Sequence, residues 1–185
     1  MTNQAAVPRY SSPLIFLHWL TAGSILLAFI LVWSLEMFDL EAVEKDVVFI
    51  HKSFGLLVIV LTVLRLLVKL SGKGGEGVVD PDPKINLFSK LGHLGLYGFM
   101  FVTPFIGWLK SNAGGREASL FGIPFPTLLE KNRDLADLFG EMHEVTAYLF
   151  LALIALHAAA AIWHQVARKD GVMYSMLPMK HLLPK

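Results

Sequence analysis

The chain contains no cysteine, and only 17% of its 185 residues are charged. Without cysteine it can form neither a disulfide-stapled scaffold nor a thiolate-bound zinc or iron–sulfur site. A soluble globular domain carries roughly 25% charged and 45–50% apolar residues, whereas 55% of this chain is hydrophobic. The same composition excludes a disordered chain. Against this apolar background the chain carries seven histidines, which are the feature to explain.

Long stretches without Asp, Glu, Lys or Arg divide the sequence. The longest are residues 10–35, 91–109 and 145–167, and a membrane-crossing helix needs about 20 apolar residues. Residues 53–64 form a shorter stretch, whose flanking Lys and Arg can reach toward the lipid headgroups. We therefore predict an all-α fold, an integral membrane four-helix bundle forming a single domain over residues 1–185. Its predicted spans are roughly 13–36, 47–70, 86–110 and 137–167.

The charged residues are distributed unequally between the two sides of this bundle. Four spans put both termini on one side, together with the connection between the second and third spans. That side carries ten basic and four acidic residues, whereas the other side carries six basic and eleven acidic residues. The positive-inside rule then predicts that both termini are cytoplasmic. The outer face is expected to be acidic.

The connections between the spans differ in kind. The inner connection, 71–82, is rich in Gly, Asp and Pro and reads as a plain linker. The outer connection, 111–142, is longer and contains a hydrophobic turn at 121–126 and a helical pattern around Leu128–Leu138. A connection this long and apolar is expected to pack on the membrane face of the bundle.

The histidines fall at two depths in the predicted spans. His143 and His157 are 14 residues apart, which is about 21 Å along a helix, and they face nearly the same way. His18 lies at the inner level and can meet only His157 or His164. His51 lies at the outer level and can meet only His143. The sequence thus predicts two levels, each with two imidazoles from different helices.

Two imidazoles at each level suit planar macrocycles stacked across a bundle. Imidazole is a good ligand for haem iron, and helix bundles commonly hold such cofactors. Two axial histidines leave no open position on the iron, so such a centre passes electrons and binds no substrate at the metal. The absence of C-x-x-C-H excludes covalent attachment, which leaves b-type haem. Zinc fits less well because it takes three or four ligands at one point. Taken singly, a histidine at a helix end is most often an interfacial polar residue.

Other polar residues follow the same levels. Arg65 comes 14 residues after His51 and shares its face at the inner depth, where it suits a haem propionate or a snorkelling anchor equally well. A polar group at the inner level suits the carbonyl oxygens of a quinone or contact with lipid headgroups. Its members are Ser89, Lys90, His93 and His164.

Several short motifs, taken in their order and spacing, resemble the bacterial cytochrome b561 family from about Arg9 to Pro178. They are His18-Trp19-Leu20, His51-Lys52-Ser53-Phe54-Gly55, Gly92-His93-Leu94 with Tyr97, Leu156-His157-Ala158-Ala159-Ala160 with His164, and Lys169-Asp170 followed by Met176-Leu177-Pro178.

The resemblance implies a multi-pass protein of the bacterial inner membrane with two non-covalent b haems. The iron ligands it implies are His18 and His157 for the inner haem, and His51 and His143 for the outer haem. It also implies electron exchange with ubiquinone, with His164 as the quinone contact. The lipid bilayer and a quinone are the expected partners, and no nucleic acid is expected.

Three functions fit this reading. The first is an electron carrier between the quinone pool and a periplasmic-side donor or acceptor, such as a soluble redox protein. The second, known in the family, is a superoxide oxidase that passes electrons from superoxide to quinone. The third is a haem-bearing anchor subunit of a dehydrogenase. A His-lined metal transporter is a fourth, different class.

The acidic outer face bears on this choice. It suits a basic soluble partner and disfavours capture of the superoxide anion, which positive charge would steer. A local basic patch would reverse that argument, and its candidates are Lys52, Lys110, Arg116 and Arg133. His181, in the polar tail, has no assigned role.

Overall fold

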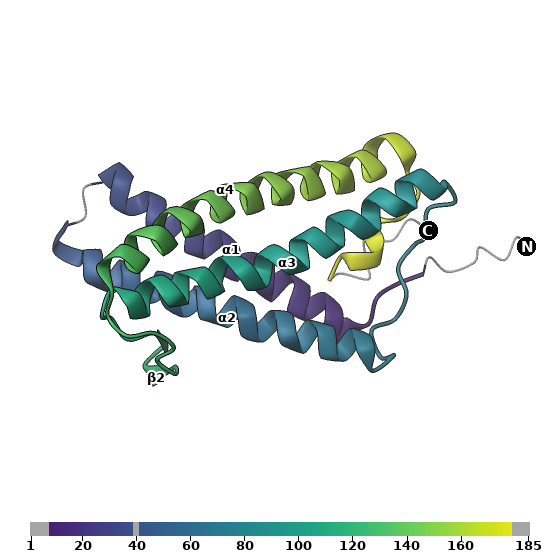
Figure 1. Cartoon of the computed structure of the whole chain (residues 1–185). Coiled ribbons are helices and arrows are strands. Elements are labelled where there is room, and N and C mark those ends of the chain that lie inside the picture. The colour runs from purple at the N-terminus through teal and green to yellow at the C-terminus, as the bar shows by residue number, and fades with distance from the viewer. Residues whose placement is uncertain (1–7, 39–40, 179–185) are drawn as a thin grey trace, which may run out of the picture.

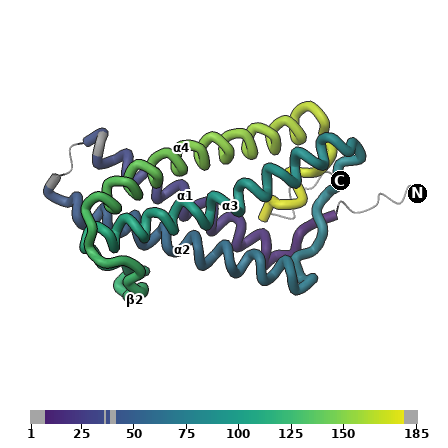
Figure 2. The backbone as a smooth tube through the Cα atoms, in the orientation of Figure 1, coloured from purple at the N-terminus to yellow at the C-terminus, as the bar shows by residue number. Residues whose placement is uncertain are grey.

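The computed structural model describes residues 8–38 and 41–178, and its long elements are four helices. Figure 1 shows them side by side in an elongated bundle, and Figure 2 shows the same course of the chain as a tube. The predicted all-α class is confirmed. The helices are α1 (Ser12–Phe38), α2 (Glu44–Leu70), α3 (Pro83–Ala113) and α4 (Arg133–Trp163).

Three segments within the described residues are long and apolar enough to cross a membrane. They are Ser12–Leu35, Glu44–Leu70 and Arg133–Arg168. The second contains the short charge-free stretch, so its flanking Lys and Arg do not prevent it from qualifying. α3 has 31 residues but does not qualify, because glycine, tyrosine, tryptophan and histidine interrupt its apolar run. A fourth crossing therefore stays a prediction.

The bundle consists of two helical hairpins. α1 packs along α2, α3 packs along α4, and contacts between α2 and α3 join the two hairpins, whereas α1 and α4 hardly touch. Small hydroxyl residues let α1 and α2 approach closely. Thr21, Ser24 and Thr62 are buried, and each donates its hydroxyl to the carbonyl four residues earlier in its own helix.

An apolar layer occupies the middle of the bundle. Val58, Met100 and Phe150 are its buried members, and the rings of Phe99 and Phe150 stack with centroids 5.9 Å apart. Phe150 is seven residues from both His143 and His157, which is about 10 Å along the axis in each direction. The layer therefore separates the two histidine levels.

α3 and α4 begin three and four residues before their predicted spans because polar caps, and not the first apolar residues, start them. The α-helical part of α4 ends at Trp163, and residues 164–168 continue as a π-helical turn. Asp82 accepts a hydrogen bond from the Lys84 amide at the start of α3, and Pro83 follows at the first helical position. Asn132 accepts from the Leu135 amide at the start of α4. The helical pattern around Leu128–Leu138 was thus placed too early, because its first residues precede this cap.

The outer connection carries a short β-hairpin of β1 (Ser119–Leu120) and β2 (Ile123–Pro124). Phe121 and Gly122 form its turn, both with positive φ, which suits a two-residue hairpin turn. The hairpin packs on α2, since Ser53 donates to the Ser119 carbonyl and accepts from the Phe121 amide. The connection thus packs on the bundle at α2, as expected, and its position toward the membrane stays a prediction.

Three segments meet at the opposite, right-hand end of Figure 1. The Ser11 amide donates to the Gly74 carbonyl, the Tyr10 amide donates to the Ser175 carbonyl, and the Trp19 indole donates to the Met176 carbonyl. The start of the chain, the α2–α3 linker and the tail are thereby tied together. The tail includes η2 (His164–Arg168), a π-helical turn, and η3 (Met173–Met176), a 3₁₀ turn. His181 lies outside the described residues.

Candidate functional site

Two histidines meet at the outer level. His51 of α2 and His143 of α4 have ring centroids 6.1 Å apart, with their planes at 89°. This is the contact that the depth argument allowed for His51.

Backbone carbonyls fix the tautomers of both outer imidazoles. Nδ1 of His51 lies 2.9 Å from the Ala28 carbonyl, and Nδ1 of His143 lies 3.0 Å from the Thr103 carbonyl. A carbonyl only accepts, so each Nδ1 carries the proton and donates. Nε2 of each ring is left with its lone pair, which is the form that ligates a metal.

Gly107 of α3 makes room for the His143 ring. A Cβ at this position would lie 2.9 Å from Cε1 and 3.0 Å from Nδ1 of His143. No such side chain fits without moving the ring, so the glycine sets how closely α3 approaches the outer pair.

A second pair forms at the inner level. His18 of α1 and His157 of α4 have ring centroids 6.3 Å apart, with their planes at 57°. Of the two partners that the sequence left open for His18, His157 is the one in ring contact. The contact crosses the seam where α1 and α4 otherwise hardly touch.

Both separations match two imidazoles on one metal ion. Metal–imidazole bonds of about 2 Å on opposite sides of an ion, plus the radius of each ring, place the centroids about 6 Å apart. The two pairs lie at levels separated by the apolar layer, so the donors do not converge on one point. The side chains therefore fit two separate two-imidazole centres better than one zinc site.

The inner pair is not oriented as the outer pair is. Arg65 is buried, and its Nη2 donates to Nδ1 of His18 over 3.3 Å. His18 therefore accepts at Nδ1, in contrast to the outer histidines. The guanidinium also lies over the Tyr97 ring, 5.2 Å from its centroid, and its Nε is buried without a hydrogen-bond partner. This orphaned donor leaves Arg65 with capacity for an anionic group.

His93 lies at the inner level, as the sequence predicted, but it also reaches His157, which the sequence did not predict. Its ring centroid lies 5.6 Å from that of His157, and its Nδ1 donates to the Ser89 carbonyl over 2.7 Å. His157 thus has two imidazole neighbours. Depth alone does not distinguish them, and only the family resemblance selected His18 as the partner of His157.

His164 lies apart from both pairs. It begins the π-helical turn after α4 and contacts the Asp170 carboxylate. Of its predicted polar group, Ser89 and His93 contact each other, with Ser89 Oγ and His93 Nδ1 3.4 Å apart. Among the described residues, His164, Asp80 and Asp170 have ligand atoms within 4.8 Å of one another, but the Arg168 guanidinium ion-pairs with both carboxylates. Its charge disfavours a cation there.

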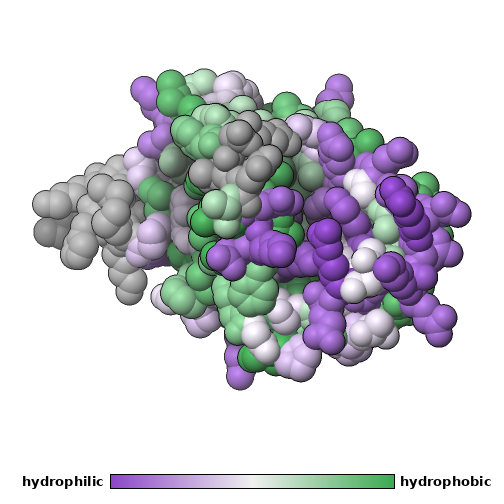
Figure 3. All heavy atoms as spheres, turned by 90° about the vertical axis from the view of Figure 1, so that its left-hand side faces the viewer, coloured by the Kyte–Doolittle hydropathy of each residue, from purple (hydrophilic) through white to green (hydrophobic). Residues whose placement is uncertain are grey.

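Basic side chains gather near the outer pair. Lys110 is close enough to act electrostatically on both His51 and His143, and Lys52 on His51. The Lys52 ammonium donates to Ser111 over 2.9 Å, and Arg116 lies beside it. We call Lys52, Lys110 and Arg116 the outer basic cluster. A shallow pocket next to it also includes Glu44 and Glu117, and Figure 3 shows hydrophilic side chains gathered over one side of this end.

The family follows from comparison with known proteins. The model of the prokaryotic cytochrome b561 family matches residues 9–179, which is nearly the whole chain. The chain belongs to this family. It is accordingly a membrane electron-transfer cytochrome, and the cofactor of the family is haem b. The resemblance seen in the sequence motifs is thereby confirmed.

The matches to individual relatives extend over most of each relative's length. The chain is 31% identical to a protein of Yersinia pestis named probable superoxide oxidase CybB, over 93% of this chain and 97% of the relative. It is 28% identical to cytochrome b561 homolog 2 of Escherichia coli K12, over 86% of each chain. It is 25% identical to cytochrome b561 homolog 1 of the same strain, over 93% and 98%.

Proposed function

We propose that this cytochrome b561 holds two b haems, one at each histidine level, and carries electrons between a quinone at the inner end and a donor or acceptor at the outer end. The ligands we assign are His51 and His143 for the outer haem and His18 and His157 for the inner haem. The single observation that carries the proposal is the pair of imidazole separations, 6.1 Å and 6.3 Å, at two levels of one bundle.

The side chains around these pairs have separate tasks. The Ala28 and Thr103 carbonyls orient the outer imidazoles, and the apolar layer around Phe150 keeps water out between the levels. Arg65 would turn its free donor toward a haem propionate. When bound, each haem supplies a one-electron iron couple without an open coordination position.

The proposal includes a topology. α3 joins α1, α2 and α4 as a fourth crossing, because it is as long as α4 and packs along it. Both termini then lie in the cytoplasm of a bacterium, at the inner membrane, as the distribution of basic residues predicts. His164 lies two turns beyond His157, at the inner end, where a quinone would bind from the membrane.

The outer basic cluster supports a second function, oxidation of superoxide. The net charge of the outer side is acidic, but Lys52 and Lys110 place positive charge near the outer imidazoles, where an anion would approach, and Arg116 lies beside Lys52. Salt screens the more remote carboxylates, so charges near the reacting centre dominate the steering of an anion; Glu44 and Glu117 of the adjoining pocket oppose the cluster. The name of the Yersinia pestis relative points the same way.

The test uses the full-length protein purified in detergent. We expect about two b haems per chain, a reduced spectrum of bis-imidazole type, and reduction of both haems by the quinol analogue decylubiquinol. One haem per chain, or a protein that decylubiquinol does not reduce, would contradict the proposal. Superoxide mixed in a stopped-flow instrument then decides the second function by reducing the haems rapidly or not at all.

A further inference from the structure

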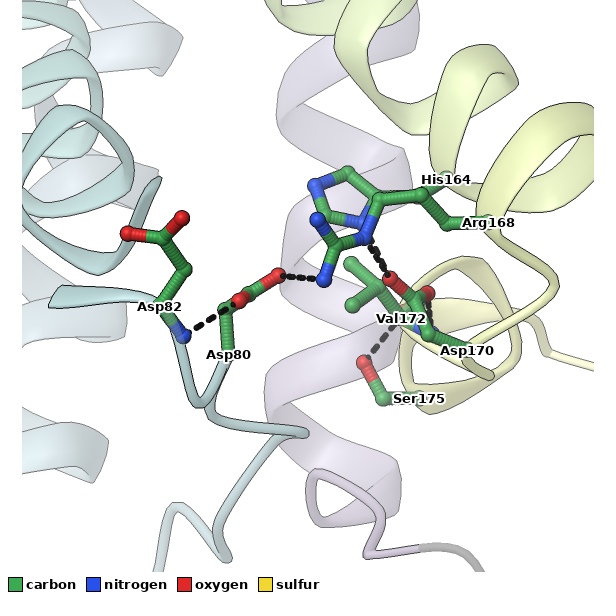
Figure 4. Close-up of polar contacts among 7 residues, drawn as sticks. All are labelled: Asp80, Asp82, His164, Arg168, Asp170, Val172 and Ser175. Atoms are coloured by element: carbon green, nitrogen blue, oxygen red, sulfur yellow. Dashed lines mark hydrogen bonds and ion pairs between the residues drawn. The ribbon is translucent and has the colours of Figure 1, made fainter. Parts of the chain in front are cut away.

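The inner end holds an ion cluster that neither histidine level uses. Every ion pair among the described residues lies in it: His164 with Asp170, Asp170 with Arg168, and Arg168 with Asp80. Asp80 comes from the α2–α3 linker, whereas the others lie at and after the end of α4. Figure 4 shows the Arg168 guanidinium between the Asp80 and Asp170 carboxylates, with the His164 ring above it.

The contact between His164 and Asp170 has a defined polarity. Nδ1 of His164 lies 2.5 Å from Oδ2 of Asp170, so the ring donates from Nδ1 to the carboxylate. The Val172 amide donates to the other oxygen over 3.2 Å, and Arg168 Nε donates to Oδ2 over 3.2 Å. Three donors therefore hold the carboxylate in place. Nε2 is the ring nitrogen left to exchange a proton, and it points away from Asp170 (Figure 4).

The local backbone supports this arrangement. His164 opens a π-helical turn that closes with the Lys169 amide donating to the His164 carbonyl over 2.7 Å. Lys169 then adopts a left-handed conformation with φ 52°, which turns the chain back so that Asp170 faces the ring. π-helical turns inside helices recur at functional sites. Here the turn brings a carboxylate onto a histidine only six residues earlier.

We propose that Asp170 is a positioning residue that holds His164 as the Nδ1–H tautomer, so that Nε2 exchanges a proton with a quinone oxygen. This inference rests on the proposed function, which supplies the quinone. Converting a quinone to its quinol takes two electrons, delivered singly by the haem cofactor, and two protons, one for each carbonyl oxygen. Protonated on both ring nitrogens, His164 gives its Nε2 proton to one carbonyl oxygen and is left neutral with Nδ1–H on Asp170. It regains a proton from water at the inner surface, and the other carbonyl oxygen takes its proton from the same water. The reverse sequence oxidises a quinol.

The charges around His164 suit this cycle. Asp170 touches the ring, while Arg168 and Asp80 stand behind it, and the Trp163 indole lies on its other side, 5.0 Å away between centroids. Asp170 is thus the charged group in direct contact with the ring, and Asp80 reaches the cluster through Arg168.

Two variants distinguish a role of the cluster in orienting His164 from a role in holding the α2–α3 linker and the tail together. Asp170→Ala removes the acceptor of the Nδ1 proton. Asp80→Asn is the matched control, because it weakens the tie to the linker while leaving the Asp170 carboxylate as the acceptor for Nδ1 of His164. A role confined to holding the linker and tail together would make the two variants behave alike.

The first readout needs no activity: ¹⁵N NMR of histidine-labelled protein reports which ring nitrogen carries the proton. We expect the Nδ1–H form of His164 in the wild type and in Asp80→Asn, and its loss in Asp170→Ala. An Nε2–H form in the wild type, or an unchanged tautomer in Asp170→Ala, would overturn the proposal. Asp170→Leu also removes the acceptor while keeping the side-chain volume, and it serves if the alanine variant does not fold.

The second readout is the rate at which decylubiquinol reduces the haems, measured against pH. We expect Asp170→Ala to be about tenfold slower across the pH range, because Nε2 of His164 is then no longer held as the nitrogen that accepts the quinol proton. Asp80→Asn should stay within about twofold of the wild type. Equal rates in Asp170→Ala and the wild type would overturn the proposal. If the wild type is not reduced at all, the proposed function fails, while the NMR result still tests the tautomer.

Discussion

The two histidine levels have similar ring separations but different surroundings. At the outer level, backbone carbonyls hold both imidazoles with Nε2 free, whereas at the inner level His18 accepts a hydrogen bond from Arg65. The outer level is thus preorganised for metal ligation, and the inner level must rearrange the Arg65 contact when His18 presents its ligating nitrogen. The outer histidine pair is therefore held by main-chain carbonyls, whereas the inner pair is contacted by the Arg65 side chain, which can change its conformation.

The largest expected effect on only one of the two levels comes from a substitution at Gly107. We expect Gly107→Ala to weaken haem binding at the outer level by about tenfold to a hundredfold, since the added Cβ would meet the His143 ring at 2.9 Å. The inner haem should remain. Gly92→Ala, in the same helix, is the control, because a Cβ at that position would meet no atom within 4 Å. Haem content after purification measures both, and equal retention in the two variants would contradict the role of the glycine.

A change at Arg65 acts on the inner level alone. Arg65→Gln removes a buried positive charge beside His18, so the oxidised iron is favoured and the midpoint potential of one haem falls by on the order of tens of millivolts. Arg65→Lys should retain most of the charge. A spectroelectrochemical titration resolves the two haems. If both potentials move together, or neither moves, Arg65 does not belong to one level.

Much of the fold and of the candidate site could be predicted from the sequence, and the features that could not be predicted have identifiable physical reasons. Charge-free stretches located the helices, and the 14-residue spacing placed His143 and His157 at separate depths. It did not distinguish His18 from His93 beside His157, because both lie at the same depth. The carbonyls of Ala28 and Thr103 left no mark on the sequence, since any residue supplies a carbonyl. Asp80 joined the inner cluster through linker geometry that composition does not encode.

A smaller effect is expected from the outer basic cluster, which would attract superoxide although the outer face is acidic overall. This effect should depend on the salt concentration. Lys110→Ala should slow reduction of the haems by superoxide several-fold at low ionic strength, and the difference should vanish as salt screens the charge. Lys131→Ala, on the same face but packed on Gly115, is the control. Stopped-flow rates across a salt series test this, and a Lys110 effect that persists in high salt would rule out steering.

The smallest expected effect is on acid stability at the inner end. Hydrogen bonds from His164, Val172 and Arg168 outweigh the effect of burial and hold the pKa of Asp170 below its ordinary value of 3.8. A lowered carboxyl pKa stabilises the fold above that ordinary value and ceases to do so as the pH falls through the folded value. The melting temperature of the wild type should therefore be higher than that of Asp170→Asn at neutral pH, and the difference should disappear in acid. A gap independent of pH would contradict this.

The central claim, one haem for each histidine pair, is tested most directly by haem content in His143→Ala, His157→Ala and the control His93→Ala. The account predicts loss of the outer haem alone in the first variant, loss of the inner haem alone in the second, and two haems in the third. The reduced spectra and redox titrations should identify which haem remains. Two intact haems in His157→Ala, or loss of a haem in His93→Ala, would contradict it.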